Sequence, residues 1–322
     1  MTIETIRTHR ATSARWEDAL DAQLEAYLFA TSDRGQRYLR GWQASAADKM
    51  KFWSPFISKA TESIAAGLFN AEPIHVDPDM MTLWEAACDG FEEEPLQESD
   101  LLTTSGFVWL PRPHTITDAH GKNITHRAFL WHPVESEDAR DPGAGRRYGV
   151  ALYLFHRLGD PDDWDIDYLK TGSWGSASLR TGDLILDHVY PWMFGTPPPP
   201  KPPLGKPATH DLQVLLRLLQ QTIVTHAPGR PTRPVRRRCK RYEFPERNVV
   251  VVRLRRPTTP TGDESEPRPV EWSHRWLVGG HWRNQWFPSL GVHRQVFISP
   301  YVKGPSDKPL IPRKTRIFDW SR

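Results

Sequence analysis

The amino-acid sequence predicts an α+β protein in which an N-terminal run of helices packs with an antiparallel sheet. Apolar residues recur at helical spacing between residues 13 and 90, whereas short strand-like runs separated by turn formers occupy residues 105–190. Helices followed by strands, instead of alternating with them, are typical of the α+β class. An apolar fraction of 38%, with 14 Trp, provides enough material for a packed core.

Four helices are expected in the first 90 residues. Trp16, Leu20, Leu24 and Leu28 share one face of the first helix, and a second helix is expected over residues 34–52. The pairs Ser54-Pro55 and Asp77-Pro78 each place a capping residue before a proline, which predicts the starts of the third and fourth helices.

Strands are expected in the next hundred residues. Residues 106–110 and 124–131 predict a hairpin with a long loop, because turn formers lie between them. Residues 148–155 are almost continuously apolar and predict a buried strand, and residues 184–189 predict another.

A proline-rich run predicts the main domain boundary. Residues 197–203 hold six prolines, interrupted only by Lys201, and such a run favours a semi-rigid extended spacer over a loop packed on its own domain. The expected organisation is an acidic α+β domain over residues 1–195, a linker over 196–208, a helix plus basic segment over 209–247, and a basic, small all-β module over 248–322. The helix, at 210–226, is amphipathic and is expected to pack, or else to bind a partner.

Charge is distributed unevenly about this boundary. The formal net charge of +3 combines 18 basic and 30 acidic side chains in residues 1–200 with 24 basic and 9 acidic side chains in residues 201–322. Residues 230–241 hold seven cations and no acid, which predicts an extended, solvated segment that contacts a polyanion. The alternative is that this segment neutralises the acidic half within the molecule.

The leading hypothesis is a nucleic-acid-binding accessory or regulatory protein, with DNA favoured over RNA as the ligand. Arginine predominates among the cations, and its planar guanidinium suits bidentate contacts with phosphate. The expected phosphate contacts are Arg236, Arg237, Arg238, Lys240, Arg241, Arg253, Arg255 and Arg256. The expected recognition surface, in which aromatic rings stack on bases, consists of Trp282, Arg283, Asn284 and Trp286.

Two other functions stay open. A nuclease-type enzyme or toxin would use His281 as acid or base and Arg283 to stabilise the phosphorane. An interaction protein would instead dock its basic segment on its own acidic half or on that of a second copy.

No metal or cofactor is expected. The acidic residues between 160 and 167 lack the spacing of a magnesium-dependent nuclease and are interpreted as a solvated loop. His114, His120, His126 and His132 recur every six residues, but this spacing matches no specific zinc pattern. Neither a phosphate-binding loop nor a Gly-x-Ser-x-Gly motif occurs.

Bulk features argue against several other classes. No run approaches the roughly 18 apolar residues that would span a bilayer, and the N-terminal residues lack the apolar core of a signal peptide. With only Cys88 and Cys239, neither a disulfide framework nor a cysteine-rich zinc site is expected. The simplest expectation is a cytoplasmic protein with reduced thiols and no membrane contact.

The last 75 or so residues carry a recognisable signature. The run Gly280-His281-Trp282-Arg283-Asn284-Gln285, followed by residues 298–305 (Ile-Ser-Pro-Tyr-Val-Lys-Gly-Pro), resembles the C-terminal module of uncharacterised proteins from high-GC bacteria and their phages or plasmids. The resemblance implies a bacterial or mobile-element context. It assigns no activity and no role to any residue.

Overall fold

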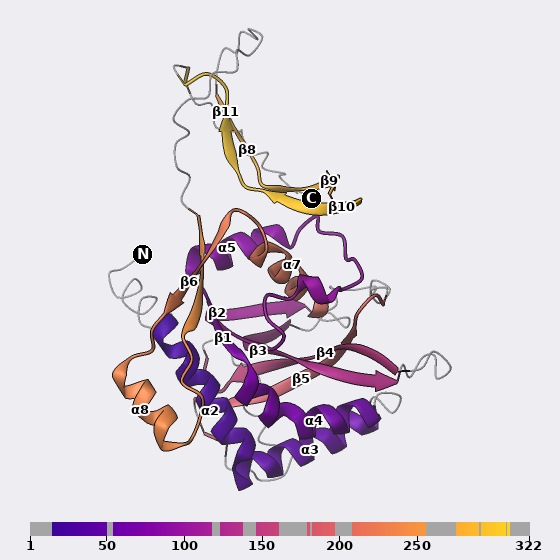
Figure 1. Ribbon diagram of the computed structural model, residues 1–322, viewed down its shortest axis with the longest axis vertical. Helices are drawn as coiled ribbons and strands as arrows, with labels where there is room; N and C mark the ends of the chain where they lie inside the picture. The colour runs from indigo at the N-terminus through magenta and orange to yellow at the C-terminus, as the bar shows by residue number, and fades with distance from the viewer. Residues whose placement is uncertain are drawn as a thin grey trace, which may run out of the picture.

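The computed structural model has the α+β architecture that the sequence predicts, with helices on both faces of one seven-stranded mixed sheet and two small ribbons near the C-terminus (Figure 1). It describes residues 15–49, 54–117, 123–137, 146–160, 179–180, 182–196, 208–255, 275–289, 291–306 and 308–309.

The helices expected before residue 90 are confirmed. Local sequence explains their starts: the Asp77 carboxylate accepts a hydrogen bond from the Asp79 amide at 3.2 Å, and Pro78 occupies the first turn. None of the described helices combines the length and apolar character that crossing a bilayer requires. The helical segments are η1 (Trp16–Asp18), α2 (Ala19–Thr31), α3 (Asp33–Lys49), α4 (Ser54–Asn70), α5 (Pro78–Ala87), η3 (Glu98–Asp100), α7 (Ala208–Leu219) and α8 (Arg233–Arg241).

The central sheet has the strand order β5-β4-β3-β2-β1-β7-β6. The short strand β1 runs parallel to both of its neighbours, and every other pair is antiparallel. Strands β2 to β5 were expected from the sequence, whereas β1 and β6 were not. The bounds are β1 (Glu72–Val76), β2 (Gly106–Thr117), β3 (Asn123–Glu137), β4 (Arg146–Arg157), β5 (Leu184–Met193), β6 (Val224–Gly229) and β7 (Val249–Leu254).

Each face of the sheet has its own apolar core. Helices α2, α3 and α4 cover one face, where Leu24 and Tyr38 pack with Phe107. Helices α5 and α7 cover part of the other, where Trp84 and Leu215 pack with other buried side chains. The alternation of strand side chains between the two faces gives this three-layer arrangement.

The sheet crosses the domain boundary that was expected near residue 200. β7 pairs with β1 on one side and β6 on the other, so the strand expected to open a separate β module belongs to the central sheet. Val249 and Val252 are fully buried, one on each face of the sheet. Because both faces of β7 are covered, the strand lies in the interior of the protein. The proline-rich run itself lies outside the described residues.

The basic segment forms a regular helix, α8, instead of the extended chain that its charge density suggested. Pro234 lies in the first turn, where a missing amide proton costs little. Val235 and Cys239, four residues apart, are buried against the α2 side of the sheet. Burial of this apolar stripe, together with the ion pairs of Arg238 with Asp21 and Glu25, stabilises the helix against repulsion between its cations.

The C-terminal residues form two separate two-stranded ribbons. In the described residues β8 (Trp276–Val278) pairs with β11 (Tyr301–Lys303), and β9 (His281–Phe287) pairs with β10 (Val292–Ile298). The sequence predicted one small all-β module over residues 248–322, of which residues 256–274 and 310–322 lie outside the described part of the chain. We call the described residues from 275 to 309 the C-terminal arm. The β8–β11 ribbon projects beyond the central sheet (Figure 1).

Candidate nucleic-acid surfaces and an acid–base cavity

One face of α8 presents a row of exposed cations. Arg233, Arg237, Lys240 and Arg241 are exposed, and at 3.6 residues per turn they fall within an arc of roughly 100°. The buried residues Val235 and Cys239 point the other way. None of the four cations forms an ion pair with a residue that the structure describes. We call these four residues the α8 basic face.

Two other arginines of α8 are engaged within the protein. Arg238 forms ion pairs with Asp21 at 2.5 Å and Glu25 at 2.6 Å, both on α2, and Arg236 lies 3.7 Å from Glu246. Arg236 and Arg238 therefore neutralise acidic residues within the molecule, which was the alternative role expected for the basic segment. The α8 basic face is exposed to solvent.

The other expected phosphate contacts lie on β7 or beyond it. Arg253 and Arg255 are exposed, and the Arg253 guanidinium lies 3.7 Å from the Asp77 carboxylate at the start of α5. Arg256 lies outside the described residues.

The expected recognition surface is divided between two faces of the β9–β10 ribbon. Trp282, Asn284 and Trp286 lie on one face, and Arg283 lies on the other because side chains alternate along a strand. The Trp282 indole N–H donates to the Ala87 carbonyl at 2.8 Å, so this residue anchors the ribbon to the end of α5. Trp286 has 49% of its surface exposed.

The structure does not bring α8 and the β9–β10 ribbon together: α8 lies beside α2, whereas the ribbon lies over α5 and α7 (Figure 1). His281, the candidate acid or base, is exposed on β9 and contacts the Gly279 carbonyl at 3.1 Å through Nδ1. The described residues of the C-terminal arm include no carboxylate that could act as its partner.

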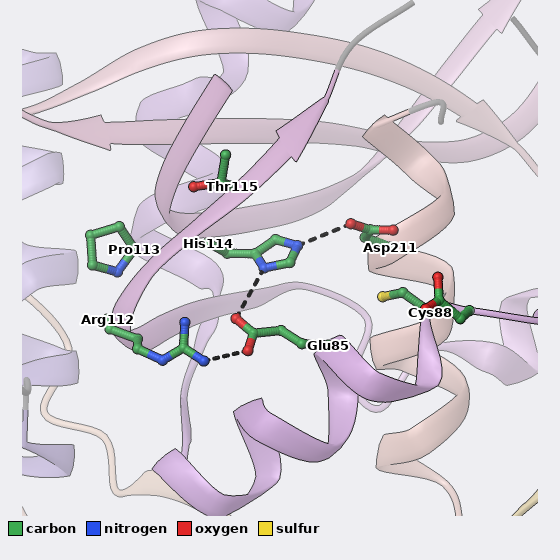
Figure 2. A pocket seen from close by; sticks show the side chains of 8 residues that line it. Glu85, Cys88, Arg112, Pro113, His114, Thr115 and Asp211 are labelled. Atoms are coloured by element: carbon green, nitrogen blue, oxygen red, sulfur yellow. Dashed lines mark hydrogen bonds and ion pairs between the residues drawn. The ribbon is translucent and has the colours of Figure 1, made fainter. Parts of the chain in front are cut away.

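A cavity of about 400 Å³ lies between α5, β2 and α7. Its lining is mostly polar and charged, and Figure 2 shows a chain of contacts along it from Arg112 through Glu85 and His114 to Asp211. The β2–β3 register shifts between Trp109 and His114, and this irregularity sets the arginine and the histidine beside α5. The lining residues are Glu85, Cys88, Asp89, Arg112, Pro113, His114, Thr115 and Asp211.

His114 is the centre of this chain. Its Nε2–H donates to Asp211 Oδ2 at 3.0 Å, whereas Nδ1 lies 3.7 Å from Glu85 Oε1, a distance at which charge acts without a full hydrogen bond. The imidazole lies against the Trp84 indole with a centroid separation of 4.1 Å, which also favours the protonated ring. Burial opposes the charge, but the hydrogen bond to Asp211 and the nearby Glu85 outweigh it and raise the pKa of His114.

Asp211 is held as a carboxylate between two histidines. His210 Nδ1–H donates to Asp211 Oδ1 at 2.9 Å, while His114 occupies the other oxygen. Burial disfavours the charged carboxylate, but these two hydrogen bonds and the nearby charges hold its pKa well below the usual range. A carboxylate that fixes an imidazole in this way can support proton transfer at the opposite ring nitrogen. The bond between Asp211 and His114 also joins α7 to β2.

A second histidine cluster lies next to the cavity. His126 pairs directly with His114 across β2 and β3 and is buried, so desolvation lowers its pKa to about 3. Its Nδ1 lies 4.0 Å from Asp187, which lies 3.0 Å from His188 Nδ1. In the part of the chain that the structure describes, no group of His, Cys, Asp and Glu has the arrangement of a metal site. His120 and residues 161–178 lie outside it.

The sequence pointed to His114 only as one member of a six-residue repeat. It did not single out Glu85, Arg112 or Asp211, because these residues lie on three separate elements and share no local motif. The only sequence signal near Asp211 was the start of an amphipathic helix.

Comparison of the chain with protein-family models, with curated proteins and with solved structures returns no match.

Proposed function

We propose that this protein binds nucleic acid, DNA in preference to RNA, through the α8 basic face. In this proposal it is a cytoplasmic accessory or regulatory protein of a bacterium or mobile element. The observation that carries the proposal is the exposure of Arg233, Arg237, Lys240 and Arg241 on one face of a helix, with no ion pair to a described residue.

The arrangement of these cations favours a polyanionic ligand. Cations three or four residues apart on a helix repel one another, and bound phosphates relieve that repulsion. Three of the four are arginines, which bind phosphate oxygens bidentately. Release of counterions from the nucleic acid supplies the affinity and makes it dependent on salt.

The orientation of α8 supports the same ligand. Val235 and Cys239 fix one side of the helix to the core, and the ion pairs of Arg238 with Asp21 and Glu25 fix its rotation. The basic face is therefore held outward by a rigid element. Arg253 and Arg255, also exposed, would extend the contact if the strand of nucleic acid reaches the end of β7.

The proposal is tested by titrating fluorescently labelled DNA with the full chain at several salt concentrations. We expect the double substitution Arg233→Gln with Arg237→Gln to weaken binding and to reduce the salt slope by about 1.8, at roughly 0.9 per phosphate contact. The matched control is Arg236→Gln with Arg238→Gln, which removes the same charge from residues that already have partners. An equal loss in both double variants, or no binding by the wild-type chain at low salt, would contradict the proposal.

A further inference from the structure

We infer that the C-terminal arm binds unpaired bases of a single-stranded nucleic acid, with Trp286 as the stacking side chain. This inference rests on the proposed function, because it identifies the form of nucleic acid that the protein takes. It concerns a surface remote from α8 and makes its own predictions.

The two tryptophans on one face of β9 have different environments. Trp282 is half-buried: its indole N–H is bonded to Ala87, and its ring contacts Phe91 and Phe297 at 5.1 and 5.2 Å between centroids. Trp286 lies four residues further along the same face, and 49% of its surface is exposed. Trp282 therefore fixes the ribbon, and the fixed ribbon holds Trp286 in solvent.

The Trp286 ring has a partner on one side only among the described residues. It pairs across the ribbon with His293, at 4.8 Å between ring centroids and an interplanar angle of 50°. A half-exposed indole that is supported by a second aromatic ring and carried on a hydrogen-bonded ribbon is a preorganised surface for another planar group.

Charge complementarity identifies the chemistry of that group. The described residues of the arm include no Asp or Glu, and the carboxylate of Glu94, which contacts Gln295 on the Trp286 face at 3.0 Å, is engaged by that amide. Two cations, Arg283 and Arg294, lie on the face of the β9–β10 ribbon opposite Trp286, and because the ribbon is only two strands wide they contribute to the electrostatic field around it. The cations of the arm are Arg275, Arg283, Arg294, Lys303 and Lys308.

A single-stranded nucleic acid matches both the exposed Trp286 ring and the positive charge of the arm, whereas a duplex matches only the charge. Single strands expose base faces that stack on aromatic side chains, with phosphates that follow a cationic surface. In a duplex the base faces are already stacked on one another, so only phosphates remain for contact. The arm therefore selects unpaired nucleotides.

The experiment compares three labelled probes of about 20 nucleotides with the full-length chain. They are a thymidine strand, a strand of the same charge with abasic sites throughout its centre, and a duplex. The variants are Trp286→Ala, Trp286→Leu, Trp286→Phe and Val292→Ala, the last removing exposed apolar surface from the same ribbon without removing a ring.

We expect Trp286→Ala and Trp286→Leu to weaken binding of the thymidine strand about tenfold, which is the scale of one base–aromatic stack. Binding of the abasic strand and of the duplex should stay within about twofold of wild type. Trp286→Phe should keep most of the affinity, and Val292→Ala should behave as wild type.

Three results would overturn the inference: an unchanged affinity for the thymidine strand, an equal loss on the abasic strand, or a dimer in sedimentation that Trp286→Ala dissociates. The third result would assign the arm to contact between copies of the chain. Failure of the proposed function has a different signature, because Arg233→Gln with Arg237→Gln would then leave duplex binding unchanged. Loss of duplex binding in that variant with no effect of Trp286 would leave the proposed function standing alone.

Discussion

The link between Asp211 and His114 makes a strong prediction about stability. Substitution Asp211→Asn keeps the shape of the side chain but removes the charge that two buried imidazoles share. His114 would then lie beside Glu85 alone, at 3.7 Å, and His210 would lose its carboxylate partner. We expect the variant to fold with a large loss of stability.

The magnitude follows from the two hydrogen bonds. Each involves a charged acceptor, and such bonds contribute about 1.5–3 kcal/mol. An asparagine can still accept from one imidazole and donate to the other if that ring changes tautomer, which recovers part of the loss. We therefore expect a decrease in the free energy of unfolding of about 2–4 kcal/mol at pH 5.5, near the range for breaking a buried ion pair.

The pKa of His114 determines how the loss of stability in Asp211→Asn changes with pH. The folded pKa of His114 lies above its ordinary value of 6.5, so its protonation stabilises the fold below that value and the contribution is lost as pH rises through the folded pKa. Asp211 is ionised throughout this window, because its folded pKa lies below its ordinary value of 3.8. The difference between wild type and Asp211→Asn should therefore be larger at pH 5.5 than at pH 9.

Urea unfolding of wild type, Asp211→Asn, His114→Gln and the double variant at both pH values measures this coupling. Substitution of the exposed His226 by Gln serves as a control and should change stability by less than about 0.5 kcal/mol. A loss below about 1 kcal/mol for Asp211→Asn, or the same coupling at both pH values, would refute the reasoning.

Three further predictions concern other parts of the fold. Gly106→Ala should lower the free energy of unfolding by about 1–3 kcal/mol in a urea titration, because its Cβ would lie 2.2 Å from Trp131 Cζ2. Trp282→Ala removes the bond to Ala87, so limited proteolysis followed by mass spectrometry should show faster cleavage in the C-terminal arm while the rest stays resistant. Arg238→Gln should cost less than about 1 kcal/mol and less still at high salt, because its ion pairs are partly exposed; a larger cost that persists in high salt would contradict this.

Local signals in the sequence were enough to predict most helices and the antiparallel part of the sheet. The Asp77-Pro78 cap and the apolar spacing of α2 act within a few residues, so they are readable without a fold. β1 was missed because its five residues include Pro73 and His75, and its strand character depends on neighbours contributed by distant segments.

The candidate sites likewise combine features that the sequence predicts with features that depend on distant segments. The cations of α8 were visible in the sequence, but their division into paired and exposed groups depends on Asp21 and Glu25, which lie more than 200 residues earlier. The His114 cavity could not be predicted, because Glu85 and Asp211 reach it from helices on either side of β2 in the sequence.

The pairing of β1 with β7 determines when the protein can fold during its synthesis. Ile74 pairs with Val250, so the ribosome must add the intervening chain, at about 5–20 residues per second, before β1 acquires its second neighbour. Until then one edge of a buried parallel strand stays open to other chains, and such edges promote aggregation. A fragment that ends in the proline-rich run would keep that open edge permanently, and a fragment that begins there would carry β7 without β1. The natural unit for expression is therefore the chain through at least residue 255, and aggregation of shorter nascent chains is the hazard this topology creates.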